Sequence, residues 1–220
     1  MAVASPADLL RQRLTEGKGR LLVLGATSGV WLMDMLLAHH LEHDQQIEAA
    51  WRGPVLVIEQ LGTLLFVVIT VGLVVALYRA SHRQLFRWSL AYLSFSVVQV
   101  IANVLGMVFT AHHGNSTGLS SLWDVAAVYM QSVLVFMFIY IFLDVSTPGG
   151  AFVWPSRDAE APPTPHLIDY LFISLNVNST YGPTSEALMS RPAKLVMSLQ
   201  VLLAMLMLTV LIARAVSATG

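Results

Sequence analysis

Five long runs of apolar residues constrain the fold of this chain more than any other feature. They lie at about 20–41, 54–78, 88–111, 122–144 and 191–216. A helix needs about 20 mainly apolar residues to cross a bilayer, and it satisfies its backbone hydrogen bonds internally. The runs lack the alternating pattern of an outer-membrane barrel. They therefore predict an all-α polytopic membrane protein with four transmembrane helices, a shorter element and a final transmembrane helix.

The composition agrees with this prediction and excludes several functions. The 220 residues are 56% hydrophobic and 11% charged, whereas soluble domains carry about 25% charged residues. The net charge of −1 gives no reason to expect nucleic acid as a partner. Without cysteine, disulfides and thiol catalysis are excluded. No catalytic motif appears, so we expect neither an enzyme nor a cofactor. The expected surroundings are membrane lipids.

The basic residues predict the orientation of the chain. Four of them precede the first run, between positions 11 and 20, and Arg79, Arg83 and Arg87 lie between the second and third runs. The loop between the first two runs instead holds three acidic residues and one arginine, Arg52. Because loops rich in Lys and Arg stay in the cytoplasm, we expect the N-terminus there, in a multi-pass protein of the plasma membrane.

The segment before the last run divides the chain into three regions. These are an N-terminal four-helix region (1–144), a Pro/Gly-rich connector (145–165) and a C-terminal region (166–220). Thr164 and Pro165 suit the N-cap and first position of a helix. The apolar stretch HLIDYLFISL that follows is too short to span a bilayer, which favours a re-entrant half-helix.

The C-terminal region resembles the pore-loop and inner-helix unit of potassium channels. The similarity rests on DYLFIS at 169–174, NSTYGPT at 178–184 and the apolar run from Ser190 to Val216. It implies an oligomeric pore of four identical subunits that passes a small inorganic ion, a cation. The residues expected to line the pore are Asn176, Asn178, Ser179, Thr180, Tyr181 and Gly182.

This segment departs from the potassium filter T-V-G-Y-G-D at two informative positions. Thr180 replaces the first glycine, and Pro183 replaces the aspartate. The glycine geometry costs a residue with a Cβ about 1–3 kcal/mol of backbone strain. We therefore predict a wet constriction lined by side chains, with weak preference for potassium over sodium, rather than a stack of dehydrated carbonyl rings.

The predicted orientation leaves two topologies open. With five spans and a cytoplasmic N-terminus, the pore-like segment starts in the cytoplasm, whereas a potassium-channel pore loop enters from outside. Either residues 166–184 cross the membrane completely, which gives six crossings, or the half-pore is inverted.

Polar residues inside the predicted spans are a second set of candidate functional positions, because acids and amides are rare there. The third run carries a polar and small stripe from Tyr92 to Thr110, which suits either helix packing or the wall of a hydrated path with Gln131 opposite. Asp124 and Asp144 are expected at the membrane interface. The intramembrane candidates are Asp34, Glu59, Gln99, Asn103 and Gln131.

Histidines gather near two predicted extracytoplasmic ends. His39 and His43 are four residues apart and share a helix face, and His112 and His113 end the third run. Such a group could ligate Zn²⁺ or Cu²⁺, sense pH or contact only water and lipid headgroups. The alternative to a channel is therefore a non-conducting sensor or structural membrane protein with a His-rich outer face.

Overall fold

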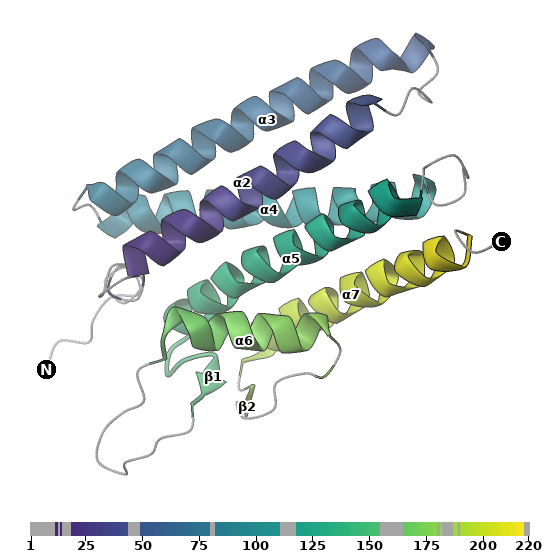
Figure 1. Ribbon diagram of the computed structural model, residues 1–220. Coiled ribbons are helices and arrows are strands. Elements are labelled where there is room, and N and C mark those ends of the chain that lie inside the picture. Colours follow the sequence, from purple (N-terminus) through teal and green to yellow (C-terminus); the bar gives the residue numbers. More distant parts are fainter. Residues whose placement is uncertain are drawn as a thin grey trace, which may run out of the picture.

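The computed structural model is a bundle of long helices with a two-residue pairing of strands at one end (Figure 1). The chain order is α2 (Gly19–His43), α3 (Ala49–Tyr78), α4 (His82–Thr110), α5 (Gly118–Ser146), β1 (Phe152–Val153), α6 (Leu167–Asn178), β2 (Ala187–Leu188) and α7 (Arg191–Ser217).

The structure describes residues 12, 14, 19–43, 49–79, 82–110, 118–154, 165–179, 181, 187–188 and 190–217. Within the helices and strands, the side chains at 19, 20, 22, 38–43, 49–61, 82, 109–110, 118–122, 187–188, 214 and 217 lie outside the described part.

The helices agree with the prediction of an all-helical membrane protein. Three of them are long and apolar enough to cross a bilayer, over Arg83–Val108, Trp123–Ser146 and Arg191–Ala213. The described apolar parts of α2 and α3 are shorter, at Val23–Leu37 and Gly62–Tyr78. Helix α4 begins at His82 rather than at 88, so Arg83 and Arg87 belong to its first turns.

Helix α5 forms the centre of the bundle, in contact with α2, α4, α6 and α7. Val133, Phe136 and Tyr140 on this helix are completely buried. Helix α3 packs on α4, and Gly72 of α3 allows a close approach between the two helices. A Cβ at position 72 would lie 2.6 Å from the ring of Trp88, so a larger residue would push the two helices apart.

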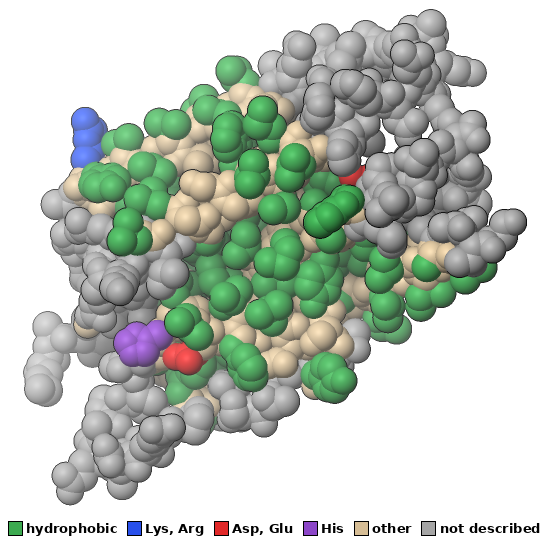
Figure 2. Space-filling model, viewed as in Figure 1, with side chains coloured by type: hydrophobic (Ala, Val, Ile, Leu, Met, Phe, Trp, Pro, Cys, Tyr) green, Lys and Arg blue, Asp and Glu red, His purple; other side chains and the backbone are tan. Residues whose placement is uncertain are grey.

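The outer surface of the bundle is mainly apolar over the face shown in Figure 2. Exposed apolar side chains follow α3 and α7; they include Leu64, Val68, Val71, Leu195, Leu202, Met205 and Ile212. Contiguous apolar surface of this kind is unfavourable in water and suits contact with lipid tails or with another apolar helix.

Strands β1 and β2 hold together two points of the chain that flank α6. They are antiparallel, with Phe152 opposite Leu188 and Val153 opposite Ala187. Helix α6 begins beside the end of α5, where Tyr170 contacts Asp144, and its last residue, Asn178, contacts Tyr129. Helix α6 is therefore antiparallel to α5, and both flanks of the segment between the strands lie at one end of the bundle (Figure 1).

The boundaries of α6 correct the sequence prediction at both ends. His166 is the N-cap and Leu167 the first helical residue, so Pro165 precedes the helix; Thr164 lies outside the described residues. The backbone N–H of His166 donates to Asp169 Oδ2 at 2.6 Å, which places the cap beyond the proline. At the other end, the helix extends past the predicted stretch HLIDYLFISL and includes Asn176 and Asn178.

Candidate functional site

A buried carboxylate, Asp144, organises the end of the bundle where α5 and α6 meet. Its side chain is 7% exposed, so Asp144 is buried within the protein near the end of the apolar span Trp123–Ser146. Oδ1 accepts hydrogen bonds from the backbone N–H groups of Ala151 at 2.8 Å and Phe152 at 3.3 Å. Oδ2 accepts from the Tyr170 hydroxyl at 2.6 Å and from Trp154 Nε1 at 3.2 Å. Four donors surrounding both oxygens satisfy a buried carboxylate without a cation.

A tight turn brings the chain back over Asp144. Gly149 and Gly150 adopt positive φ angles of 80° and 87°, which glycine reaches without steric cost. A Cβ at Gly150 would lie 3.1 Å from Asp144 Oδ1. The turn leads to an aromatic group in which the rings of Trp154 and Tyr170 lie 5.0 Å apart. The hydrogen bonds of Asp144, the turn at Gly149 and Gly150 and the ring contact of Tyr170 together hold the N-terminal end of α6 against α5.

A buried amide, Gln200, joins α7 to α5 and α6. Its Oε1 accepts from the Tyr140 hydroxyl at 2.5 Å. Its Nε2 donates to Ser174, at 3.1 Å from the carbonyl oxygen and 3.0 Å from Oγ, and lies 3.4 Å from Asn178 Oδ1. Gln200 is completely buried, so water cannot reach its amide group. These hydrogen bonds therefore satisfy polar atoms that would otherwise be unpaired.

Asn178 ends this network at the C-terminus of α6. Its Oδ1 accepts from the Ser132 hydroxyl at 3.3 Å, and its Nδ2 donates to the carbonyl oxygen of Tyr129 at 3.3 Å. One helical turn earlier, the Ser174 hydroxyl donates to the carbonyl oxygen of Val133 at 2.8 Å. The side chain of Asn178 thus points into the contact between α5, α6 and α7, where it positions the helix.

The other residues expected to line a pore lie around the same helix end. Asn176 is half-buried, and its Nδ2 has no hydrogen-bond partner among the described residues. Ser179 is exposed and donates to the carbonyl oxygen of Asn176. Tyr181 is 83% exposed. Thr180 and Gly182 lie outside the described residues, so the expected filter geometry at Thr180 stays a prediction.

The intramembrane candidates belong to the other half of the bundle. Asn103 Nδ2 donates to Gln131 Oε1 at 2.8 Å, which confirms that Gln131 faces the polar stripe of α4. Gln99 lies on the same stripe, and Asp34 interacts electrostatically with Tyr92 of that stripe. The side chain of Glu59 lies outside the described part. The structure thus brings together Asn103 and Gln131.

The histidine site falls outside the described side chains. His39 and His43 lie on α2, whose backbone alone is described there, while His112 and His113 are not described. No group of three His, Asp or Glu residues that could hold a metal occurs in the described ranges. The zinc or copper site stays a prediction.

Sequence reasoning missed the residues that carry the α5–α6–α7 network. Tyr140, Ser174 and Gln200 were not singled out, and Asp144 was expected at the membrane interface without any protein partner being named. Two signals were present: Gln200 is an amide within an otherwise apolar run, and Ser174 and Asn178 are four residues apart, on one helix face.

Comparison of the chain with protein families, with curated proteins and with solved structures finds no match.

Proposed function

We propose that this protein passes a small cation across the plasma membrane through a channel-like pore built around α6, with α6 as a re-entrant half-helix. The observation that carries the proposal is the pairing of β1 with β2, which joins both flanks of α6 at one end of the bundle. A helix of twelve residues whose flanks meet in this way suits a segment that enters and leaves on the same side.

The depth of α6 supports a re-entrant helix. Its ends contact Asp144 and Tyr129, which are fifteen residues apart on α5. At 1.5 Å per residue this is about 22 Å, while the hydrocarbon core of a bilayer is about 30 Å thick. The C-terminal end of α6 therefore lies well inside the membrane, where irregular backbone is tolerated only against protein or water.

The direction of α6 favours a cation. Its C-terminal end carries the partial negative charge of the helix dipole, and in the proposed topology this end is the one inside the bilayer. The N-terminal end is matched by Asp169 in the first turn. At the tip, Asn176 and Ser179 add polar side-chain atoms. An ion there would meet amide and hydroxyl groups rather than a fixed charge.

The basic residues favour the inverted form of the half-pore. Helix α4 runs antiparallel to α5, since the rings of Phe86 and Phe142 lie 4.7 Å apart. Arg79, Arg83 and Arg87 therefore lie at the end where α5 finishes and α7 starts with Arg191 and Lys194. By the positive-inside rule this end faces the cytoplasm, so α6 enters from the cytoplasm.

A pore around α6 requires more than one subunit. Its inner face is occupied by the network around Asn178, whereas its outer face exposes Ile168 (65%), Phe172 (49%) and Leu175 (38%). Copies of the chain that meet on this apolar face would bring their α6 tips together. We propose a homo-oligomer, with the four subunits that the resemblance to potassium channels implies.

Ion flux into liposomes tests this function. Purified protein should admit K⁺ and Na⁺ with a permeability ratio close to one, because hydrated polar side chains discriminate weakly. Asn176→Leu and Ser179→Leu should reduce the flux, while Ser198→Leu, a control on the exposed face of α7, should not. Strong potassium selectivity would contradict the wet constriction, and flux equal to that of protein-free liposomes would remove the function.

The second candidate is a non-conducting sensor or structural membrane protein. The paired inner face of α6 favours it, because Ser174 and Asn178 hold the helix against its own subunit. A purified monomer without ion flux would support this candidate.

A further inference from the structure

A stripe of polar side chains crosses the bundle along α4, away from α6. Ser89, Tyr92, Ser96, Gln99 and Asn103 recur every three or four residues, so they lie on one helix face. Ser89, Tyr92 and Ser96 are 6%, 1% and 0% exposed. The stripe therefore faces the interior of the bundle rather than lipid.

Four polar atoms of this stripe have no hydrogen-bond partner among the described residues. Ser89 Oγ, Tyr92 OH, Ser96 Oγ and Gln99 Oε1 are buried, and none has a hydrogen bond to a residue that the structure describes. The Ser96 and Tyr92 hydroxyl groups lie close to each other, and neither makes a hydrogen bond of good geometry to any other described residue. Buried polar atoms are paired in nearly all proteins, and where protein groups are missing, internal water takes their place.

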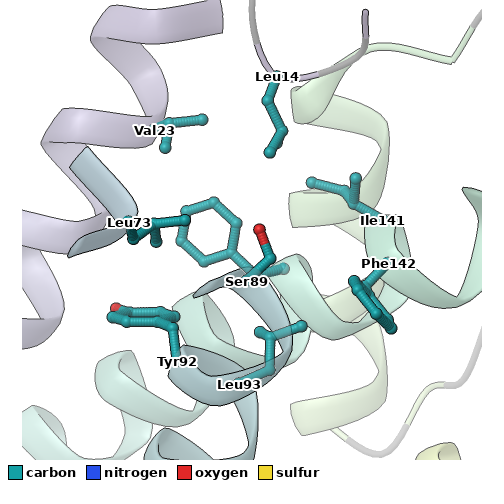
Figure 3. A pocket seen from close by; sticks show the side chains of 9 residues that line it. Leu14, Val23, Leu73, Ser89, Tyr92, Leu93, Ile141 and Phe142 are labelled. Carbon is teal, nitrogen blue, oxygen red and sulfur yellow. The ribbon is translucent and has the colours of Figure 1, made fainter. Parts of the chain in front are cut away.

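A cavity at one end of the stripe has room for such water. It has a volume of about 20 Å³ and is lined by Ser89 and Tyr92 together with apolar side chains, among them Leu73 and Phe142. In Figure 3 the Ser89 hydroxyl points into the middle of this space. A cavity needs about 10–15 Å³ to hold one water molecule. Size and unpaired hydroxyl groups both fit a bound water.

The spacing of these polar side chains suits a continuous single file of water molecules. Residues three or four apart on a helix face are about 5–6 Å apart, which is two hydrogen bonds joined by one water. Ser89 and Asn103 are fourteen residues apart, or about 21 Å. Their midpoint coincides with that of the apolar span Arg83–Val108. The file is thus centred in a hydrocarbon core of about 30 Å and leaves about 5 Å at each end.

We propose that each subunit holds a file of water along α4, from Ser89 to the Asn103–Gln131 pair, and that this file conducts protons. Each water or hydroxyl oxygen in it accepts a proton from one neighbour and releases another to the next, so no atom needs to travel the whole distance. The path differs from the pore proposed around α6 and does not depend on it.

An acid, Asp34, and an amide, Gln131, lie beside the proposed file of water. Asp34 on α2 has an electrostatic effect on Tyr92, which places an acid near the Ser89 end of the path. At the far end, Gln131 Oε1 is bound to Asn103, whereas Gln131 Nε2 has no partner in the described part of the chain. This N–H group can donate to the last water, and the amide pair forms the narrow point of the path.

Proton entry into liposomes tests the file. Purified full-length protein is reconstituted with a pH-sensitive dye inside, and a potassium diffusion potential drives protons inward. Entry should exceed that of protein-free liposomes. Tyr92→Phe and Ser96→Val should each slow it about tenfold, because one unpaired link raises the barrier by the cost of a lost buried hydrogen bond. Asp34→Asn should also slow it.

The controls separate this path from the pore around α6. Ser198→Val on the exposed face of α7 should leave proton entry unchanged, and so should Asn176→Leu, which affects the pore. Tyr92→Phe changes no carbon atom, so it decides the matter even if Ser96→Val fails to fold. Proton entry no faster than in protein-free liposomes, or unchanged in Tyr92→Phe, would overturn the proposal.

Discussion

The two halves of the bundle treat buried polar groups in opposite ways. In the half formed by α5, α6 and α7, Asp144 and Gln200 have hydrogen-bond partners for both of their polar atoms. In the half around α4, Ser89, Tyr92 and Ser96 have none among the described residues. Paired groups hold helices in one arrangement, whereas unpaired ones leave room for water. The difference distinguishes buried polar groups that hold helices together from buried polar groups that are open to internal water.

The largest expected effect comes from Asp144→Asn. The four donors around the side chain require two acceptor oxygens, and asparagine offers one oxygen and a repelling NH₂ group. Losing charged hydrogen bonds and leaving donors unpaired should lower the free energy of unfolding by about 3–5 kcal/mol. Thermal unfolding in detergent measures it. Asp124→Asn, at the half-exposed other end of α5, is the matched control. Equal effects from both variants would contradict the special role of Asp144.

A somewhat smaller effect is expected for Gln200→Leu. Leucine fills a similar volume but leaves the Tyr140 hydroxyl and the Ser174 side chain without their partner. Unfolding should become easier by about 2–3 kcal/mol. Chemical denaturation in mixed micelles provides the measurement, with Ser198→Ala as control on the same helix. A stabilised Gln200→Leu variant would show that packing outweighs this network.

The turn over Asp144 offers a comparison of two neighbouring glycines. Gly150→Ala should destabilise by about 2 kcal/mol, through its positive φ and through contact of the new Cβ with Asp144. Gly149→Ala, with a similar φ but open space around the Cβ, should cost about 1 kcal/mol. The difference between the two melting temperatures isolates the contact with the carboxylate. Identical values would mean that the backbone alone sets the cost.

The smallest expected effect sharpens the comparison of the two halves most directly. Ser132→Ala removes a hydroxyl that donates to Asn178 and should cost about 1 kcal/mol. Ser89→Ala removes a hydroxyl without a described protein partner and should change stability by less than about 0.5 kcal/mol. Both serines are buried, so solvent exposure does not explain a difference. A larger cost at Ser89 would contradict the division drawn above.

The helices could be predicted from the sequence because apolar length is a local property. The runs at 88–111 and 191–216 became α4 and α7 nearly as expected, and Gln131 faces the α4 stripe as helical spacing suggested. Membrane helices owe their existence to backbone pairing within the segment, so neighbouring helices change them little.

The partners of polar groups could not be predicted in the same way. Asp144 was expected at the interface because it ends an apolar run, and nothing in that run indicates its four donors, which come from residues 151–154 and from α6, up to 26 residues away. Gln200 pairs with Tyr140 across 60 residues. Such contacts depend on how helices pack in three dimensions, which apolar periodicity does not determine.

The pairing of β1 with β2 has a consequence for how this chain can vary. Opposite residues on paired strands have Cα atoms about 5 Å apart, so a short bridge between β1 and β2 would be enough to close the chain. Such a bridge would remove the Trp154 and Tyr170 donors of Asp144 and the Ser174 and Asn178 partners of Gln200. The chain between the strands is therefore not needed for connectivity, but it is needed for the packing of α5 against α7, so deletions within it should be tolerated only where they leave α6 in place.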